Sequence, residues 1–289
     1  MSGKFKLNVV ICGMSGLVGS KLYDFFISKH CDVEGISIRE NTPLEDIATK
    51  IKNCDILINL SGVTILARWS ESYKKRLYSS RIDTTKKLVD AIEICKDRPK
   101  LFLSASAVGI YESNLVHNDS SQNYADDFLA HLCLDWETQA KRADEFGVRS
   151  VQTRFGVIYA KDGGAITKML PPFKLGVGGK LGSGNQMVSW IHIDDLVSAI
   201  DFIIKTPAIR GSVNFTSPKP LSNSQQTQIM GNILNRSTFF TVPAFAIKLI
   251  FGEGSVVMLD SKEVYPSKLL ENGFIFKYEN FEDAFHQLV

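Results

Sequence analysis

The sequence predicts an α/β fold: a doubly wound parallel sheet with a smaller C-terminal lobe. Two observations support this prediction. Short apolar strands alternate with helical segments from residue 8 to residue 155, and glycines cluster where the first strand passes into the first helix. Strand–helix alternation is typical of parallel sheets, because the connection between parallel neighbours is usually a helix.

The first strand, residues 8–12, ends in a turn with the spacing G-x-x-G-x-x-G. Gly13 lets the chain leave the strand in a conformation that a Cβ opposes. Bare backbone at Gly16 lets a pyrophosphate approach the helix N-terminus, and Gly19 permits close packing of helix on strand. The turn therefore predicts a dinucleotide site of the Rossmann type, against the alternative of a glycine-rich turn without a ligand. The residues expected to bind the cofactor here are Gly13, Ser15, Gly16, Leu17, Val18 and Gly19.

The elements that follow complete the predicted sheet. Strands are expected over residues 32–38, 55–60, 101–103 and 150–155, and helices over residues 17–25, 43–52, 71–95 and 126–145. The interval between Arg39 and Ile56 has room for one helix but hardly for a further strand, so the adenine side of the sheet is expected to lack a strand. Because the crossovers are right-handed, the ligand crevice lies at the carboxyl ends of the strands, where Gly13, Arg39, Ser61 and Ser106 fall.

Beyond Phe155 the chain is heavily punctuated by glycine and proline. Predicted here are strands over 189–192, 213–216 and 239–242, a helix from Asp194 as N-cap to Ile204, and helices over 222–234, 243–251 and 280–288. We divide the chain into a Rossmann domain that binds NAD(P), residues 1–160, and a substrate-side and C-terminal lobe, residues 161–289, interleaved with the sheet across a soft boundary. The run 176–184 is expected to form an exposed loop that closes over the substrate.

Composition excludes several function classes. A net charge of +2 on 289 residues makes no electrostatic case for nucleic acid or an anionic membrane. No apolar run approaches ~20 residues, and the N-terminus lacks the apolar core of a signal peptide. Five scattered cysteines without a C-x-x-C pair indicate reduced thiols. We expect a cytoplasmic protein with a small-molecule substrate and without a metal site, and leave a homodimer open.

Arg39 predicts NADP in preference to NAD. At the end of the second strand, a carboxylate holds a ribose 2′-hydroxyl, whereas an arginine accommodates a 2′-phosphate. Arg39 stands about 20 residues beyond the glycines, as this fingerprint requires. Glu40 could play the opposite role, which keeps NAD as the less favoured cofactor, and a solvated arginine is the remaining alternative.

Several stretches carry a resemblance to a known family. The early glycines, the residues 59–62, the strand end 104–106 and the segment 190–195 occur in the order typical of extended and atypical short-chain dehydrogenase/reductases. A narrower resemblance is to the group called epimerase family protein, whose members are also named nucleoside-diphosphate-sugar epimerase or cell-division-inhibitor SulA homologue. It covers essentially the whole chain and rests on Arg68-Trp69, Ser80-Arg81, Leu132-Cys133, Trp136-Glu137, Asp162-Gly163-Gly164, Met169 to Phe173, Gly182-Ser183-Gly184 and Pro266 to Phe276.

The resemblance implies further site residues. Leu60, Ser61 and Gly62 are expected to pass beside the adenosine ribose and the diphosphate. Ser106 is expected to hydrogen-bond the reacting oxygen. One of the arginines Arg68 and Arg81 could bind an acidic group of the substrate, with a surface salt bridge as an equal alternative.

The catalytic pair of that family is missing here. Its members place a lysine four residues after a tyrosine, and the lysine cation lowers the phenol pKa. If Glu137 takes the family position that follows the lysine by four, the lysine position is Cys133 and the tyrosine position is Leu129. Tyr111, five residues after Ser106, is the candidate replacement, although a tyrosine that only satisfies a buried hydrogen bond is more common.

Three functions follow, and the sequence leaves open whether the protein is an enzyme. The first is an NADP-binding oxidoreductase of the atypical short-chain type, acting on a small or nucleotide-linked carbonyl or hydroxyl substrate. The second is a catalytically degenerate NADP-binding regulatory protein, which the missing pair favours. The third is a sugar-nucleotide epimerase, which also needs the missing acid/base.

Overall fold

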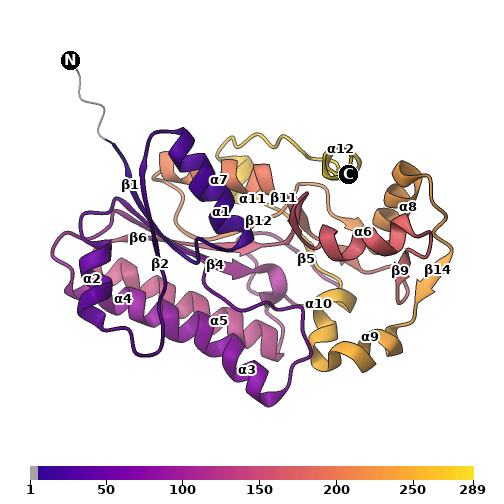
Figure 1. Ribbon diagram of the computed structural model, residues 1–289, viewed down its shortest axis with the longest axis horizontal. Helices are drawn as coiled ribbons and strands as arrows, with labels where there is room; N and C mark the ends of the chain where they lie inside the picture. The colour runs from indigo at the N-terminus through magenta and orange to yellow at the C-terminus, as the bar shows by residue number, and fades with distance from the viewer. Residues whose placement is uncertain (1–5) are drawn as a thin grey trace.

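The computed structural model describes residues 6–289, and its centre is a six-stranded parallel sheet with helices on both faces (Figure 1). The strand order is β12-β6-β4-β3-β1-β2, and every neighbouring pair is parallel. The strands are β1 (Asn8–Cys12), β2 (Asp32–Ile36), β3 (Ile56–Asn59), β4 (Leu101–Ala107), β6 (Arg149–Phe155) and β12 (Gly211–Phe215). The predicted fold class is confirmed.

The sheet ends at β2, as the short interval after Arg39 predicts. From β2 the chain passes through a single helix, α2 (Leu44–Ile51), and re-enters the sheet as β3 on the other side of β1. Within the described residues, no further strand pairs with the free edge of β2. The adenine side of the sheet is therefore one strand shorter than in the full doubly wound arrangement.

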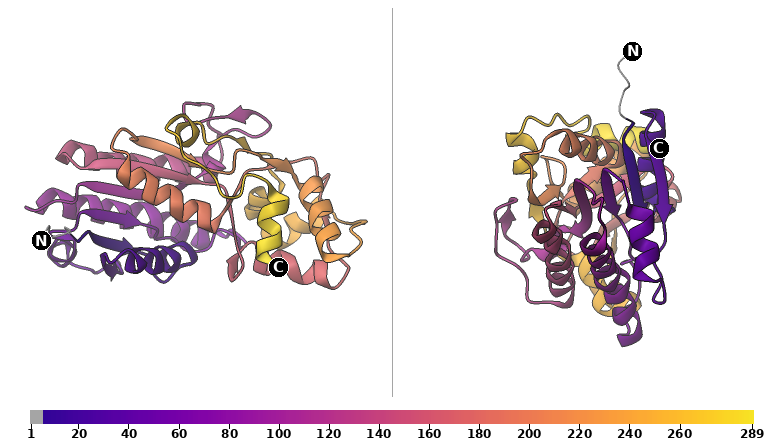
Figure 2. Two further views of the ribbon diagram at one scale, coloured as in Figure 1. Left: turned by 90° about the horizontal axis from the view of Figure 1, so that it is seen from above. Right: turned by 90° about the vertical axis from the view of Figure 1, so that its left-hand side faces the viewer.

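Alternate side chains of the strands build two separate cores, one on each face of the sheet. Val9 and Ile11 pack with α1 (Leu17–Ser28) and α7 (Ile193–Lys205), whereas Val10 and Cys12 pack with α2 and α4 (Thr84–Ile94). The helix α5 (Phe128–Lys141) lies beside α4 on the second face (Figure 2). Strands buried on both faces explain the nearly continuous apolar runs in the sequence.

The remaining elements form a smaller lobe beside the carboxyl edge of the sheet (Figure 1). Its helices are α6 (Ile166–Lys174), α8 (Asn223–Leu234), α9 (Ala244–Phe251), α10 (Val256–Leu259), α11 (Ser267–Glu271) and α12 (Phe281–Leu288). Its short strands pair as β7 (Val157–Ala160) with β8 (Gly163–Gly164) and β11 (Trp190–His192), β9 (Gly179–Leu181) with β14 (Phe240–Val242), β10 (Met187–Val188) with β13 (Leu221–Ser222), and β5 (Val116–His117) with β15 (Glu263–Val264). Because β12 and α7 come from this half of the chain but complete the sheet, the lobe is interleaved with it; the boundary at residue 160 stays a prediction.

Three predicted boundaries were wrong. β2 ends at Ile36, two residues early, while β4 continues to Ala107, because β6 pairs with it as far as Phe155. The helix predicted over 71–95 is divided into α3 (Glu71–Tyr78), the π-helical segment η1 (Ser79–Asp83) and α4. A 3₁₀ turn, η3 (Arg142–Phe146), replaces the end of the helix predicted over 126–145; the other 3₁₀ turns are η2 (Val108–Ile110) and η4 (Gly252–Ser255).

Two local interpretations also need correction. The N-cap of α7 is His192, whose Nδ1 accepts the Asp194 N–H at 3.2 Å, so Asp194 lies in the first turn instead of capping it. The run 176–184 is only partly an exposed loop, since Gly178 and Gly179 are buried and Gly179 begins a strand. A Cβ at Gly179 would lie 1.9 Å from the Phe240 carbonyl oxygen, which explains the glycine by strand pairing.

Replacing Gly19 by alanine is expected to lower the free energy of unfolding by about 1–3 kcal/mol, the usual cost of overpacking. The added Cβ would lie 2.4 Å from the Gly13 carbonyl oxygen and would push α1 away from the turn. Urea denaturation measures the change, and S20A, at the exposed neighbouring position, should stay within ~0.5 kcal/mol of wild type. Equal stability of G19A and wild type would contradict the close approach of α1.

Candidate functional site

The glycine turn after β1 has the geometry of an anion site. Gly13 adopts a φ of +84°, and a Cβ there would lie 2.9 Å from the Leu60 carbonyl carbon. Gly16 is exposed and forms the N-cap of α1. Among the described residues, no side chain caps this helix and no acidic residue occupies its first turn. Free N–H groups and the positive end of the helix dipole therefore face the crevice, as phosphate binding requires.

The end of β3 is held level with that turn. The Leu60 N–H donates to the Cys12 carbonyl at 2.9 Å, and the buried Asn59 side chain fixes the next residue. Its Oδ1 accepts the Ser61 N–H at 3.2 Å and the Ser61 hydroxyl at 2.5 Å. Asn59 therefore orients the backbone of the turn, and Ser61 and Gly62 border the same crevice as Gly13.

A second cation lies near Arg39 at the end of β2. The Arg39 N–H donates to Thr42 Oγ1 at 2.8 Å, which closes a tight turn, and its side chain is exposed. Lys87, on α4, donates to the Arg39 carbonyl at 3.0 Å and also to the Glu40 carbonyl. Sequence reasoning missed Lys87, because only the packing of α4 beside α2 brings it to this turn.

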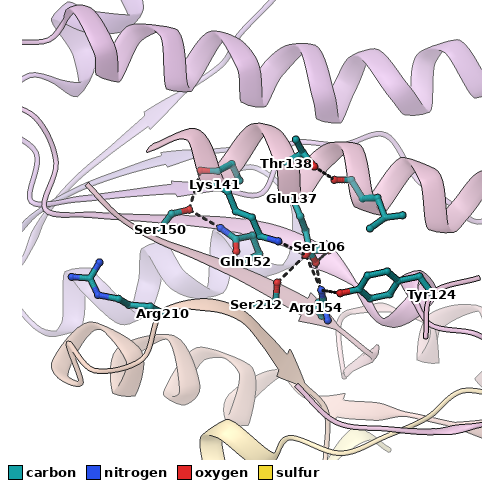
Figure 3. Close-up of polar contacts among 12 residues, drawn as sticks. Ser106, Tyr124, Glu137, Thr138, Lys141, Ser150, Gln152, Arg154, Arg210 and Ser212 are labelled. Atoms are coloured by element: carbon teal, nitrogen blue, oxygen red, sulfur yellow. Dashed lines mark hydrogen bonds and ion pairs between the residues drawn. The ribbon is translucent and has the colours of Figure 1, made fainter. Parts of the chain in front are cut away.

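Ser106 belongs to a buried polar network (Figure 3). Its hydroxyl, on a residue only 2% exposed, donates to Glu137 Oε1 at 2.8 Å. Arg154 contacts the same carboxylate with two donors, Nε at 2.7 Å from Oε1 and Nη2 at 2.8 Å from Oε2, while Ser212 donates to Oε2 at 2.8 Å. The carboxylate is thereby satisfied by β4, β6 and β12 from its position on α5.

The network keeps both charges in place. Burial alone would raise the pKa of Glu137, but the hydrogen bonds and charge of Arg154, with those of the two serines, hold it below its ordinary value. Burial would lower the pKa of Arg154, and Glu137 more than compensates, so that pKa is raised. A bidentate pair of this kind combines charge with fixed direction.

Tyr111 lies in the same network but is 0% exposed. Its hydroxyl accepts Arg154 Nη1 at 2.7 Å and lies 2.8 Å from Asn214 Oδ1 and 3.0 Å from the Asn118 carbonyl. Burial raises its pKa to about 12, although Arg154 opposes that rise. The structure therefore joins Ser106 and Tyr111 through Glu137 and Arg154, yet it encloses the phenol in protein.

The tyrosine and lysine positions of the resemblance contain no replacement pair. Leu129 and Cys133 are buried on the face of α5 that packs on β4 and η1. Burial raises the pKa of the Cys133 thiol to about 12, so it stays protonated near neutrality. The described residues also contain no group of three potential metal ligands, and no helix among them is long and apolar enough to cross a membrane.

A cavity of about 520 Å³ opens in the C-terminal lobe. The 176–184 run contributes Gly182 and Ser183, and the other walls are Gln186, Ala244, Lys248, Ser255, Val256, Leu259 and Asp260. Asp260 pairs with Lys262 at 3.2 Å, and Lys262 donates to the Tyr111 carbonyl at 2.5 Å. One wall of the cavity is therefore connected to the loop that carries Tyr111.

A parallel sheet with a glycine-rich turn and an uncapped helix at its carboxyl edge defines a dinucleotide-fold α/β protein. The chain belongs to the NAD dependent epimerase/dehydratase family, whose model matches residues 9–214. A second model, described as a domain of unknown function (DUF1731), matches residues 242–288.

Relatives with the name epimerase family protein match nearly the whole chain. SH2119 of Staphylococcus haemolyticus is 36% identical over 97% of this chain and 98% of its own length. A chloroplastic SDR39U1 homolog of Arabidopsis thaliana is 38% identical over 93% of this chain and 77% of its own. The crystal structure of human SDR39U1 (isoform 2) with NADPH matches with a TM-score of 0.89 and 28% identity, over 98% of this chain and 99% of the human one. The resemblance found in the sequence is confirmed.

Replacing Glu137 by glutamine is expected to destabilise the protein by about 3–5 kcal/mol, because it leaves Arg154 buried without its counter-charge. The double variant E137M/R154M removes both charges and should recover much of that loss. Urea denaturation at pH 7 measures both variants. A loss below 1 kcal/mol in E137Q would contradict the buried pair.

The same variant carries a pH signature. Because the folded-state pKa of Glu137 is lowered, its ionised form stabilises the protein fully above the ordinary pKa of 4.5, and this contribution disappears as the pH falls through the lowered value. The stability difference between wild type and E137Q should therefore shrink below about pH 4.5. A difference that is constant down to pH 3 would argue against an ionised carboxyl.

Proposed function

We propose that this protein binds NADP(H) at the β1–α1 turn and acts as an oxidoreductase on a small or nucleotide-linked carbonyl or hydroxyl substrate. The observation that carries the proposal is the turn itself: Gly13 and Gly19 have no space for a Cβ, and Gly16 presents an uncapped helix N-terminus. The human relative that shares this fold is described with NADPH, which supports the same cofactor here.

The residues of the crevice suit that cofactor. The α1 N-terminus would hold the diphosphate, and Leu60, Ser61 and Gly62 would border it. Arg39, with Lys87 beside its carbonyl, would accommodate the 2′-phosphate. Ser15, Leu17 and Val18 supply the first helical turn. The cavity beside Gly182 and Ser183 provides the space for a substrate.

The chemistry assigned to the chain's own residues starts from Ser106. When bound, NADP(H) would supply or accept the hydride. Because the Ser106 proton is directed to Glu137, the free lone pair of Oγ accepts a hydrogen bond, which orients a substrate hydroxyl. Tyr111 remains the candidate proton donor; its pKa of about 12 keeps the phenol protonated near neutrality.

A second function, cofactor binding without turnover, is favoured by one specific observation. Leu129 and Cys133 occupy the positions of the tyrosine and lysine and are buried, and Tyr111 is fully enclosed. Such a protein would use cofactor binding as a regulatory signal. A sugar-nucleotide epimerase ranks third, since epimerisation also requires the missing acid/base. For either main function we infer a cytoplasmic location, on which the free cysteines bear, and leave a homodimer open.

NADPH is expected to raise the melting temperature more than NADH does at equal concentration. R39A should bring the two shifts close together, because the guanidinium contacts only the 2′-phosphate in this proposal. R210A, at an exposed arginine that precedes β12, is the matched control and should keep the NADPH preference. Equal shifts for the two cofactors in wild type would remove the preference, and no shift with either would remove the proposal.

Substrate-dependent oxidation of NADPH, measured across a panel of carbonyl compounds, tests turnover. S106A should lower kcat by about 10²-fold, the usual effect of losing one positioned polar group, while NADPH affinity stays unchanged. S212A, which removes a donor to the other oxygen of Glu137, should keep most of the activity. Activity that S106A leaves intact would exclude Ser106 from this role, and wild-type NADPH binding without any turnover would favour the regulator.

A further inference from the structure

Arg81 is a half-buried guanidinium at the carboxyl edge of the sheet. It lies in η1, the π-helical segment between α3 and α4. Nη2 donates to the Val63 carbonyl at 2.9 Å and Nη1 to the Leu77 carbonyl at 3.3 Å. A Cβ added to the exposed Gly62 would lie 3.0 Å from Cζ of Arg81. The guanidinium therefore lies directly beneath the turn that borders the cofactor crevice.

This cation has no acidic partner within the described residues. Arg154, by contrast, is paired with Glu137 at 2.7 Å. The face of Arg81 packs on the ring of Trp136, 5.3 Å from its centroid, and its nearest titratable neighbours are Cys133 and Tyr73. Burial lowers the pKa of Arg81, which an arginine tolerates without losing its charge. A half-buried charge without a counter-ion is costly, so an anion that binds there gains unusually much.

The position of Arg81 also accounts for the missing lysine. In the family that the chain resembles, a cation stands where Cys133 stands here. Cys133 is a neutral, buried thiol, and the Arg81 guanidinium reaches the same side of α5 from η1. π-Helical segments often occur at functional sites, because the inserted residue shifts side chains out of the ordinary helical register. The positive charge at this edge is thus retained on a different element.

We propose that Arg81 is the anion-binding residue of the crevice and takes a phosphate or carboxylate oxygen that enters beside Gly62. The group comes either from the cofactor diphosphate or from the substrate. This inference deepens the proposed function and rests on it for the identity of the ligand, but the charge, burial and location of Arg81 do not depend on it. Arg149 illustrates the alternative of a structural arginine: it donates to the carbonyls of Ile203, Thr206 and Ile209 at the amino end of β6, away from the crevice.

The test uses R81M, with R81K as the variant that keeps the charge and R149M as the matched structural control. NADPH affinity is measured by fluorescence titration. Binding of inorganic pyrophosphate is measured by calorimetry, on free protein and on protein saturated with NADPH. Losing one charge-assisted contact should weaken binding at least ~10-fold in R81M, with partial rescue in R81K. R149M should lower the melting temperature but leave both affinities within ~2-fold of wild type.

The pattern of losses identifies the source of the anion. Weaker NADPH binding in R81M assigns Arg81 to the cofactor diphosphate, whereas unchanged NADPH binding with lost pyrophosphate binding to the NADPH-saturated protein assigns it to the substrate. If wild type binds no NADPH but binds pyrophosphate in an Arg81-dependent way, the proposed function fails and this inference stands. Unchanged affinities in a folded R81M overturn it.

If R81M does not fold, G62A provides the same test, because its Cβ displaces the guanidinium without removing it. The expected result is again a loss of at least ~10-fold in the affinity for NADPH or pyrophosphate. Wild-type affinities in a folded G62A would likewise overturn the inference.

Discussion

One buried carboxylate ties together the elements that form the carboxyl edge of the sheet. Glu137, on α5, accepts hydrogen bonds from Ser106 on β4, Arg154 on β6 and Ser212 on β12. An ionised group in this position is tolerated only because every oxygen lone pair that faces the protein has a donor. α5 is consequently held at one height over the sheet, and with it the region beside Ser106 where chemistry would take place.

That constraint limits what the site can do. The Ser106 proton is committed to Glu137 and the Tyr111 phenol is enclosed beside Arg154, so neither side chain is a ready acid toward the crevice. The cofactor side is different, because Gly13, Gly16 and the uncapped N-terminus of α1 are pre-formed and need no rearrangement. The molecule thus keeps the binding half of a short-chain dehydrogenase site and has rebuilt the catalytic half around an ion pair.

The sequence predicted the features that local patterns carry. The β1–α1 turn, the strand–helix alternation and the missing strand after β2 depend on residues close together in the chain, so their spacing was sufficient. The errors occurred where tertiary contacts override local preference. Pro171 and Pro172 were interpreted as breaks but lie inside α6, where both are exposed. Asp194 is a common N-cap residue, yet the ring of His192, buried beside Tyr278, takes that role.

Sequence alone thus determined the fold class, the family resemblance and the anion-binding turn, because strand periodicity and glycine spacing are short-range properties. Only the tertiary structure decided that Glu137 and Arg154 form a pair, that Lys87 reaches the Arg39 turn and that Arg81 lies beneath Gly62. These contacts join residues 17 to 48 positions apart, and no spacing rule indicates them. They arise because parallel strands and their crossover helices bring distant segments to one edge of the sheet.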